Sequence, residues 1–164
     1  MLPTRIHASL WNGISELRAA EWRRTLGEIN SANRFVPVSF SPGSESALEL
    51  VRPPRAGYQF RVYRDVDEIA ATVQLAPTET DAFVAEYSSA IQHMLGLRSG
   101  ADPQGLEAVD YAKRVIHDEA AAYMREVTRP ALGMTLEDAR RLFTLVYLVA
   151  SDLPDEALGL LHRR

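Results

Sequence analysis

The amino-acid sequence predicts an α+β fold in which a small antiparallel β-meander of about three to four strands packs against a bundle of about four helices. Three observations favour this class. Hydrophobic residues alternate with polar ones in the middle of the chain, they recur at helical spacing on both sides of it, and one late helical segment is apolar all round. The 164 residues are 46% hydrophobic and 24% charged, which is typical of one globular domain over residues 1–164.

The N-terminal part of the chain is predicted to form an amphipathic helix over residues 14–31. Apolar side chains recur there at near-helical spacing among charged ones, namely Ile14, Leu17, Trp22, Leu26 and Ile29. The next stretch reads RFVPVSF, a short extended run that Pro37 interrupts, and this suits the edge of a sheet. The sheet region is expected over residues 35–76.

Three strands are predicted in that region from period-two alternation, which puts one apolar face toward a core and one polar face toward water. Short connections between them favour antiparallel hairpins. The residues predicted to share the apolar face are Leu48, Leu50, Tyr58, Phe60, Val62, Ile69, Ala71, Val73 and Leu75.

The rest of the chain, residues 79–162, is predicted to be helical. A first helix starts near Thr78 or Thr80 and runs to about residue 97, and a second covers residues 106–127. Thr135 and Asp138 resemble a capping box, and the helix that they open is apolar on all sides after Arg141, as a central buried helix is. A last short segment carries Leu158, Leu160 and Leu161, and it either docks on the chain or pairs with a partner.

Composition excludes several kinds of chemistry. The chain has no cysteine, which excludes disulfides, thiolate metal sites and thiol catalysis. No apolar run approaches the length of a membrane span. The net charge is -4 and acidic and basic residues are interspersed, so the sequence shows no basic patch that would bind nucleic acid. No glycine-rich phosphate loop or serine-nucleophile motif is present. We expect a cytoplasmic protein without a cofactor, a metal, a nucleic-acid partner or a membrane.

The segment DYAKRVIHDE, residues 110–119, concentrates ionisable side chains on one predicted helix. Asp110 and His117 are seven residues apart and so lie about 20° from each other on a helical wheel, with Arg114 in reach of both. Asp118 points away from His117, so three ligands cannot converge on one metal ion. The candidate polar cluster is Asp110, Arg114, His117, Glu119, Arg140 and Arg141.

Two interpretations of this cluster remain open. In the structural one, Asp110, Arg114 and His117 form a satisfied network at the rim of the core, and Asp110 also pairs with Arg140. In the functional one, Asp110 orients His117 as a general base or lone metal ligand, and His93 or Glu137 completes the site.

The segments LEAVDYAKRVIHDEAAAYM and LEDARRLFTLVYLV resemble the C-terminal half of the uncharacterised protein family numbered 0262, a bacterial and mainly alphaproteobacterial family. The likeness extends upstream through EINSANRFVPV and LAPTETDAFVAEYSSAI. Ala120 stands where the family pattern has glycine, and a cysteine usual near the end of the last helix is missing, which argues against an essential thiol. The resemblance implies no activity.

Two classes of function follow from the residues. The first is a non-catalytic cytoplasmic protein-interaction or regulatory domain. The aromatic and charged residues are explained by packing and ion pairs, and no catalytic motif stands out. The alternative is a small-molecule-binding protein or enzyme that uses Asp110, Arg114, His117 and Arg140. The partner is an unknown protein or a second copy of the chain, and a homodimer is as open as a monomer.

Overall fold

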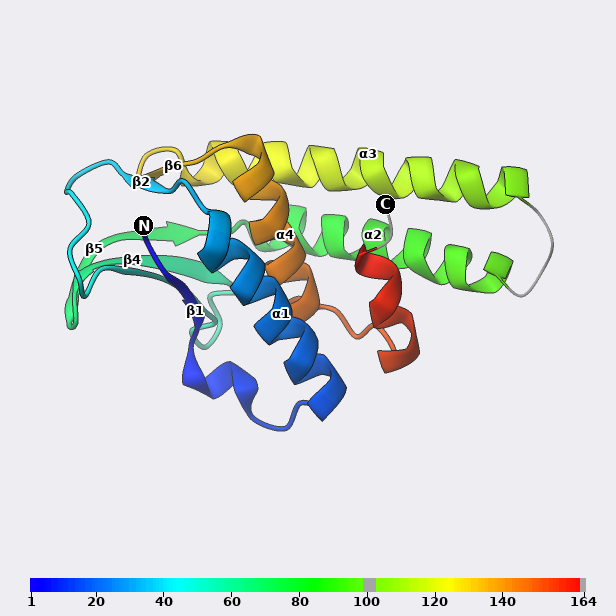
Figure 1. The fold of residues 1–164 in the computed structure, drawn as a ribbon, viewed down its shortest axis with the longest axis horizontal. Helices are drawn as coiled ribbons and strands as arrows, with labels where there is room; N and C mark the ends of the chain where they lie inside the picture. Colours follow the sequence, from blue (N-terminus) through cyan, green and yellow to red (C-terminus); the bar gives the residue numbers. More distant parts are fainter. Residues whose placement is uncertain (99–102, 163–164) are drawn as a thin grey trace.

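The computed structural model describes residues 1–98 and 103–162, and Figure 1 shows their arrangement. Most strands lie in the middle of the chain with helices on both sides, as predicted, and the fold is α+β. In chain order, the elements are β1 (Thr4–Ile6), η1 (Ala8–Trp11), α1 (Glu16–Ala32), β2 (Val36–Pro37), β3 (Ala47–Val51), β4 (Gln59–Asp65), β5 (Glu68–Gln74), α2 (Pro77–Arg98), α3 (Pro103–Thr128), β6 (Leu132–Gly133), α4 (Leu136–Ala150) and η2 (Asp155–His162).

The main sheet has four strands in the order β1-β3-β4-β5. Strands β3, β4 and β5 form the predicted antiparallel meander, whereas β1 pairs parallel to β3, so the sheet is mixed. The sequence pattern missed β1 because three residues are too few to show an alternation. The run around Pro37 does not join this sheet, since β2 pairs with β6 in a separate two-stranded sheet.

The faces of the meander follow the predicted alternation up to one irregularity. Phe60 lies opposite Leu50 and Val73, and all three are buried. The prediction that Ile69 shares this face is wrong, because its side chain is 46% exposed. A register shift between β4 and β5 sets Ile69 opposite Tyr63, and a shift of one residue moves a side chain to the other face of a strand.

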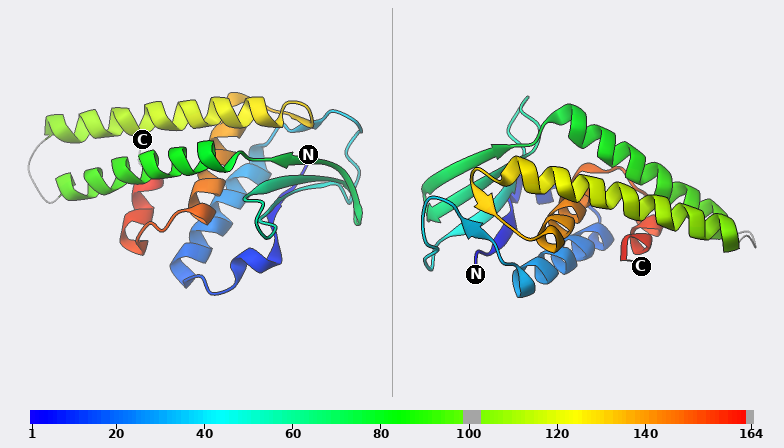
Figure 2. Two further views of the ribbon diagram at one scale, coloured as in Figure 1. Left: turned by 180° about the vertical axis from the view of Figure 1, so that it is seen from behind. Right: turned by 90° about the horizontal axis from the view of Figure 1, so that it is seen from above.

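Helix α4 is the centre of the helical layer. It packs against α1 on one side and α3 on the other, and Figures 1 and 2 show α2 and α3 side by side, extending away from the sheet. Its buried side chains include Leu142, Leu145 and Leu148, which confirms the prediction of a central helix. The predicted capping box is also present: the Thr135 hydroxyl accepts from the Asp138 backbone N–H at 3.1 Å, and the Asp138 carboxylate accepts from the Thr135 backbone N–H at 3.4 Å.

The C-terminal segment η2 docks on its own chain, against α1 and α2. Leu158 and Leu161 are buried there, and so is Leu153, which precedes η2. The side chain of Leu160, which the sequence placed in the same apolar set, lies outside the described residues.

A candidate ligand site in a polar cleft of the helical layer

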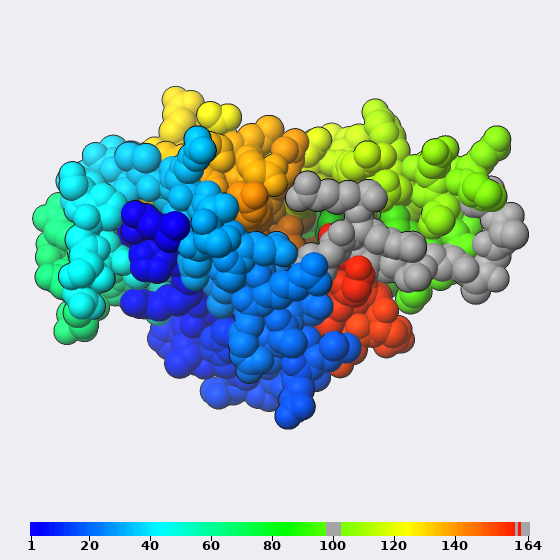
Figure 3. Space-filling model, viewed as in Figure 1, coloured from blue at the N-terminus to red at the C-terminus, as the bar shows by residue number. Residues whose placement is uncertain are grey.

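A cleft of about 510 Å³ opens between α1, α3 and α4, and we call it the polar cleft. Figure 3 shows this side of the molecule, on which α1 in blue, α4 in orange and η2 in red are visible. Side chains from five elements line it: Arg24, Thr25 and Glu28 of α1, Tyr87 of α2, Lys113, Arg114, His117 and Asp118 of α3, Glu137, Arg140, Arg141 and Thr144 of α4, and Leu161 of η2.

His117 lies at the inner wall of the cleft and is held by α4. Its Nε2 atom lies 3.1 Å from the backbone oxygen of Arg140 and 3.0 Å from the Thr144 hydroxyl. Because a carbonyl oxygen only accepts, Nε2 donates to it, which leaves Nδ1 as an acceptor. Burial lowers the pKa of His117, against the opposing effects of this backbone hydrogen bond and of Asp118. The imidazole is therefore neutral near neutral pH.

The His117 ring forms part of an aromatic wall. It stacks on Tyr87 with 5.7 Å between ring centroids and 29° between planes, and it contacts Phe143 at 5.5 Å. Burial raises the pKa of Tyr87, so its phenol stays protonated. The wall is therefore uncharged, and Tyr87 and Phe143 are buried in it behind His117.

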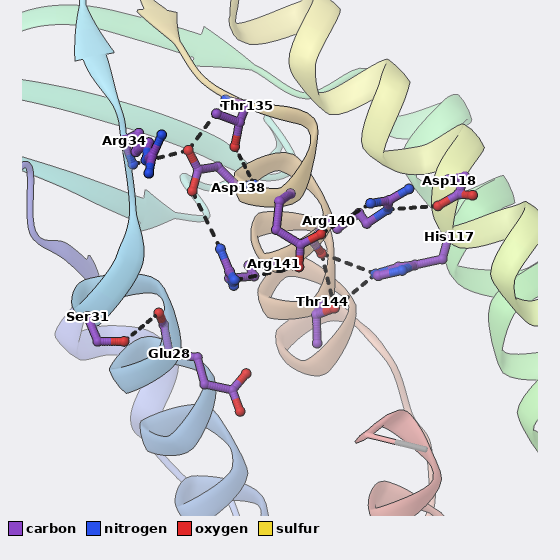
Figure 4. A network of polar contacts seen from close by, with 11 residues as sticks. Glu28, Ser31, Arg34, His117, Asp118, Thr135, Asp138, Arg140, Arg141 and Thr144 are labelled. Atoms are coloured by element: carbon purple, nitrogen blue, oxygen red, sulfur yellow. Dashed lines mark hydrogen bonds and ion pairs between the residues drawn. The ribbon is translucent and has the colours of Figure 1, made fainter. Parts of the chain in front are cut away.

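Arg140 is held in the cleft by two carboxylates. Its Nε atom donates to Asp118 at 2.8 Å and its Nη1 atom donates to Glu137 at 3.1 Å. The hydrogen bond to Asp118 is the largest cause of the raised pKa of Arg140. Figure 4 shows Arg140 directed from α4 toward Asp118 of α3, whereas Arg141 points to the opposite side of α4.

Arg141 has looser partners. Its guanidinium lies 3.5 Å from Glu137 and 3.7 Å from Asp138, and its side chain is 28% exposed. Asp138 itself is buried and accepts from the backbone N–H of Arg34 at 3.1 Å. Arg141 therefore keeps hydrogen-bond donors that a ligand can use, while Asp138 serves the start of α4.

The predicted polar cluster is only partly assembled. Asp110 pairs with Arg114 at 3.2 Å and with the buried Lys113 at 3.9 Å, not with His117 or Arg140. The helical wheel placed Asp110 and His117 correctly on neighbouring rows, but their separation of seven residues is two turns, about 10.5 Å along the axis, which is too long for a hydrogen bond. The acidic partners of Arg140 are Glu137 and Asp118, and the helical wheel had placed Asp118 away from His117.

Two other expectations concern residues near the cluster. Glu119 is exposed and does not line the polar cleft, whereas Glu137 does. His93 lies in a different groove, between α2 and α3, together with Glu86, Ser89 and Ile116. Among the residues that the structure describes, no three histidine or acidic side chains are grouped closely enough to hold a metal ion.

Several lining residues were missed by the sequence reasoning. Thr144 and Tyr87 carried no motif, and Arg24 and Glu28 showed only the i,i+4 spacing of an ordinary helical ion pair, which they form at 3.5 Å. Thr25 is buried at the cleft, and within residues 1–98 and 103–162 its hydroxyl has no hydrogen-bond partner. An unpaired buried hydroxyl costs about 1–3 kcal/mol, and Thr4, Thr80 and Ser151 share the feature outside the cleft, so it does not by itself mark a site.

No helix among the described residues is long and apolar enough to cross a membrane. Relatives of this chain are known in alphaproteobacteria. A UPF0262 protein of Rhizobium meliloti is 31% identical over 119 residues, which cover 73% of this chain and 74% of the relative. UPF0262 proteins of Allorhizobium ampelinum and Brucella anthropi are each 27% identical over the same shares of the two chains.

No solved structure matches this chain. The model of the Uncharacterised protein family (UPF0262) matches residues 9–151. That range runs from η1 to the end of α4 and contains most of the residues that line the polar cleft. The resemblance seen in the helical segments thus extends over most of the fold, and the chain belongs to the UPF0262 family.

Proposed function

We propose that this protein binds a small anionic molecule in the polar cleft and that its role is binding, as a regulatory protein would require, and not catalysis. One observation carries the proposal. Five cationic side chains line the cleft against three carboxylates, and His117 between them is neutral, while Asp110 and Asp138, which pair with Arg114 and Arg141, are not part of the lining. Such a concave, positively charged wall attracts an anion from solution.

The cations come from three helices that lie far apart in the sequence. Arg24 is on α1, Arg114 is on α3, and Arg141 is on α4. Guanidinium groups that meet from separate elements can surround an anion, and charge-assisted hydrogen bonds from them are stronger than neutral ones. Since Arg141 is only 28% exposed, its charge is less screened than that of a surface residue.

The contacts of the titratable groups support binding better than turnover. The Nε2 proton of His117 is shared between a backbone carbonyl and Thr144. The carboxylates of Asp118 and Glu137 form ion pairs with Arg140. Groups held in this way give a preorganised charged surface. The protein-interaction role predicted from the sequence stays a prediction, and a bound anion is a signal that such a partner could sense.

The experiment is a ¹H–¹⁵N NMR titration of the full chain with sodium phosphate, sodium sulfate and sodium benzoate, at constant ionic strength set with sodium chloride. At least one of these anions should shift the amide signals of cleft residues in α1, α3 and α4. The shift should weaken in Arg141→Gln and persist in Arg129→Gln, because Arg129 is an exposed arginine that does not line the cleft. No shift with any anion, or an equal shift in both variants, would refute the proposal.

A further inference from the structure

We infer that the anionic group recognised in the polar cleft is a carboxylate, and that Glu137 occupies its place in the ligand-free protein. The inference rests on the proposed function, since it names the chemical class of the ligand at the same site. It also assigns Glu137 a specific role, as an internal competitor that sets the affinity for the ligand.

The geometry of Glu137 is the first step. One of its carboxylate oxygens, Oε2, lies 3.1 Å from Nη1 of Arg140, and the other, Oε1, lies 3.5 Å from Nη2 of Arg141. A single carboxylate therefore spans two guanidinium groups with one oxygen on each. The arginine pair already holds a carboxylate, so its spacing suits the same group on a ligand.

Glu137 can give up this position without a change of fold. It lies in the first turn of α4, three and four residues before the arginines, and its side chain is 41% exposed. Rotation about its side-chain bonds moves the carboxylate into water and leaves the helix in place. Ion pairs between half-exposed side chains are worth about 1 kcal/mol or less, so a ligand with further contacts can displace it.

The remaining carboxylates favour a ligand group with one negative charge. Asp118 stays 2.8 Å from Nε of Arg140, whereas Glu28 of α1 is paired with Arg24 at 3.5 Å. Exchanging the Glu137 carboxylate for a ligand carboxylate leaves the charge around the arginine pair unchanged. A doubly charged phosphate would add a second negative charge close to Asp118, and like charges at short range repel.

The other residues that line the cleft indicate which chemical group carries the carboxylate of the ligand. His117 and Leu161 line the cleft together with Tyr87, which is buried beneath the stacked His117 ring. A flat or short apolar group attached to the carboxylate can pack on this wall while the carboxylate reaches the arginines. Benzoate has both features and serves as the probe.

The test compares benzoate affinity in three forms of the full chain by isothermal titration calorimetry at fixed ionic strength. Glu137→Gln removes the competing carboxylate, so benzoate should bind about threefold or more tightly than to the parent. Glu28→Gln is the matched control, because it removes one negative charge from the same cleft but leaves the arginine pair occupied. Its effect should be less than about twofold. Circular dichroism checks the folding of each variant.

A second measurement needs no variant. In the parent, benzoate should bind more tightly than phenylphosphonate, which has the same ring and a doubly charged head. Equal gains from Glu137→Gln and Glu28→Gln, or tighter binding of phenylphosphonate, would overturn the inference while the anion site stands. If phosphate, sulfate, benzoate and phenylphosphonate all fail to bind, the proposed function fails with it.

Discussion

At the scale of single residues, His117 shows how a neutral imidazole is kept inside a charged cleft. Its ring packs between Tyr87 and Phe143, and its Nε2 proton goes to the backbone oxygen of Arg140. The charged groups nearest to it oppose one another, since Asp118 favours protonation whereas Arg140 and Lys113 disfavour it. Burial decides the outcome and lowers the pKa.

This lowered pKa predicts a pH dependence of stability. Unfolding returns His117 to a pKa of about 6.5, so the unfolded chain binds its proton at higher pH than the folded chain does. The free energy of unfolding should therefore fall as the pH drops through about 6.5 toward the lower folded-state pKa, and be unaffected by this group above it. Urea unfolding at about pH 7.5 and about pH 5.5 should show a smaller fall in His117→Gln than in the parent. An equal fall in the free energy of unfolding in His117→Gln and in the parent would show that other titratable groups cause the pH dependence.

At the scale of elements, α4 is held at both ends by residues that are distant in the sequence. At its start, Asp138 joins the capping box with Thr135 and also accepts from the backbone of Arg34. At its end, α1 supplies the donors: Trp22 donates to the backbone oxygen of Leu148 at 3.3 Å, and Arg18 donates to the same oxygen at 3.1 Å. The arginines of the cleft are thus presented by a helix that is fixed at each terminus.

Removing the Arg18 contacts should loosen this arrangement. Its guanidinium also donates to the backbone oxygens of Ser151 and Leu153, which follow α4. Arg18→Met keeps much of the side-chain volume but leaves these half-buried carbonyls without their charged donor, so the free energy of unfolding should fall by about 2 kcal/mol. In Arg23→Met, on the exposed side of the same helix, the loss should stay below about 1 kcal/mol. Urea melts of the two variants compare them, and equal losses would show that the α4 contacts of Arg18 carry no special weight.

At the scale of the whole molecule, η2 closes the helical layer against α1 and α2. It also contributes Leu161 to the lining of the polar cleft, which connects the C-terminal segment to the candidate site. The sequence left open whether this apolar segment docks on its own chain or on a second copy. Leu158 and Leu161 are buried within one chain, so these two side chains are covered without a partner.

A chain that ends at Ser151 should therefore lose stability, and its oligomeric state should not change. Truncation removes Leu153, Leu158 and Leu161 and exposes the surfaces of α1 and α2 that they cover. Loss of three buried leucines should lower the free energy of unfolding by on the order of 4 kcal/mol or more. Urea unfolding measures the loss, and light scattering of both forms measures the mass. A halved mass at unchanged stability would instead place the segment on a second copy of the chain.

Local patterns in the sequence determined most of the secondary structure. The helices, the capping box at Thr135, the burial of α4 and the apolar face around Phe60 were all predicted correctly, because each depends on side-chain period or on residues within one turn. The exception within the meander is Ile69, where the register shift reversed the face, and a shift of this kind depends on the pairing of two strands.

Tertiary structure alone decided which elements meet, and with that the composition of the polar cleft. The sequence placed Asp110, Arg114, His117, Arg140 and Arg141 in one candidate polar cluster. The spacing of residues within a helix shows which of them share a face, but it does not show which other helix packs against that face. The fold moved Asp110 out of contact with His117, paired Asp118 with Arg140, and brought Arg24, Thr25 and Glu28 of α1 to the same cleft. These meetings follow from the packing of α1 and α3 on α4, which buries apolar side chains spread over the whole chain.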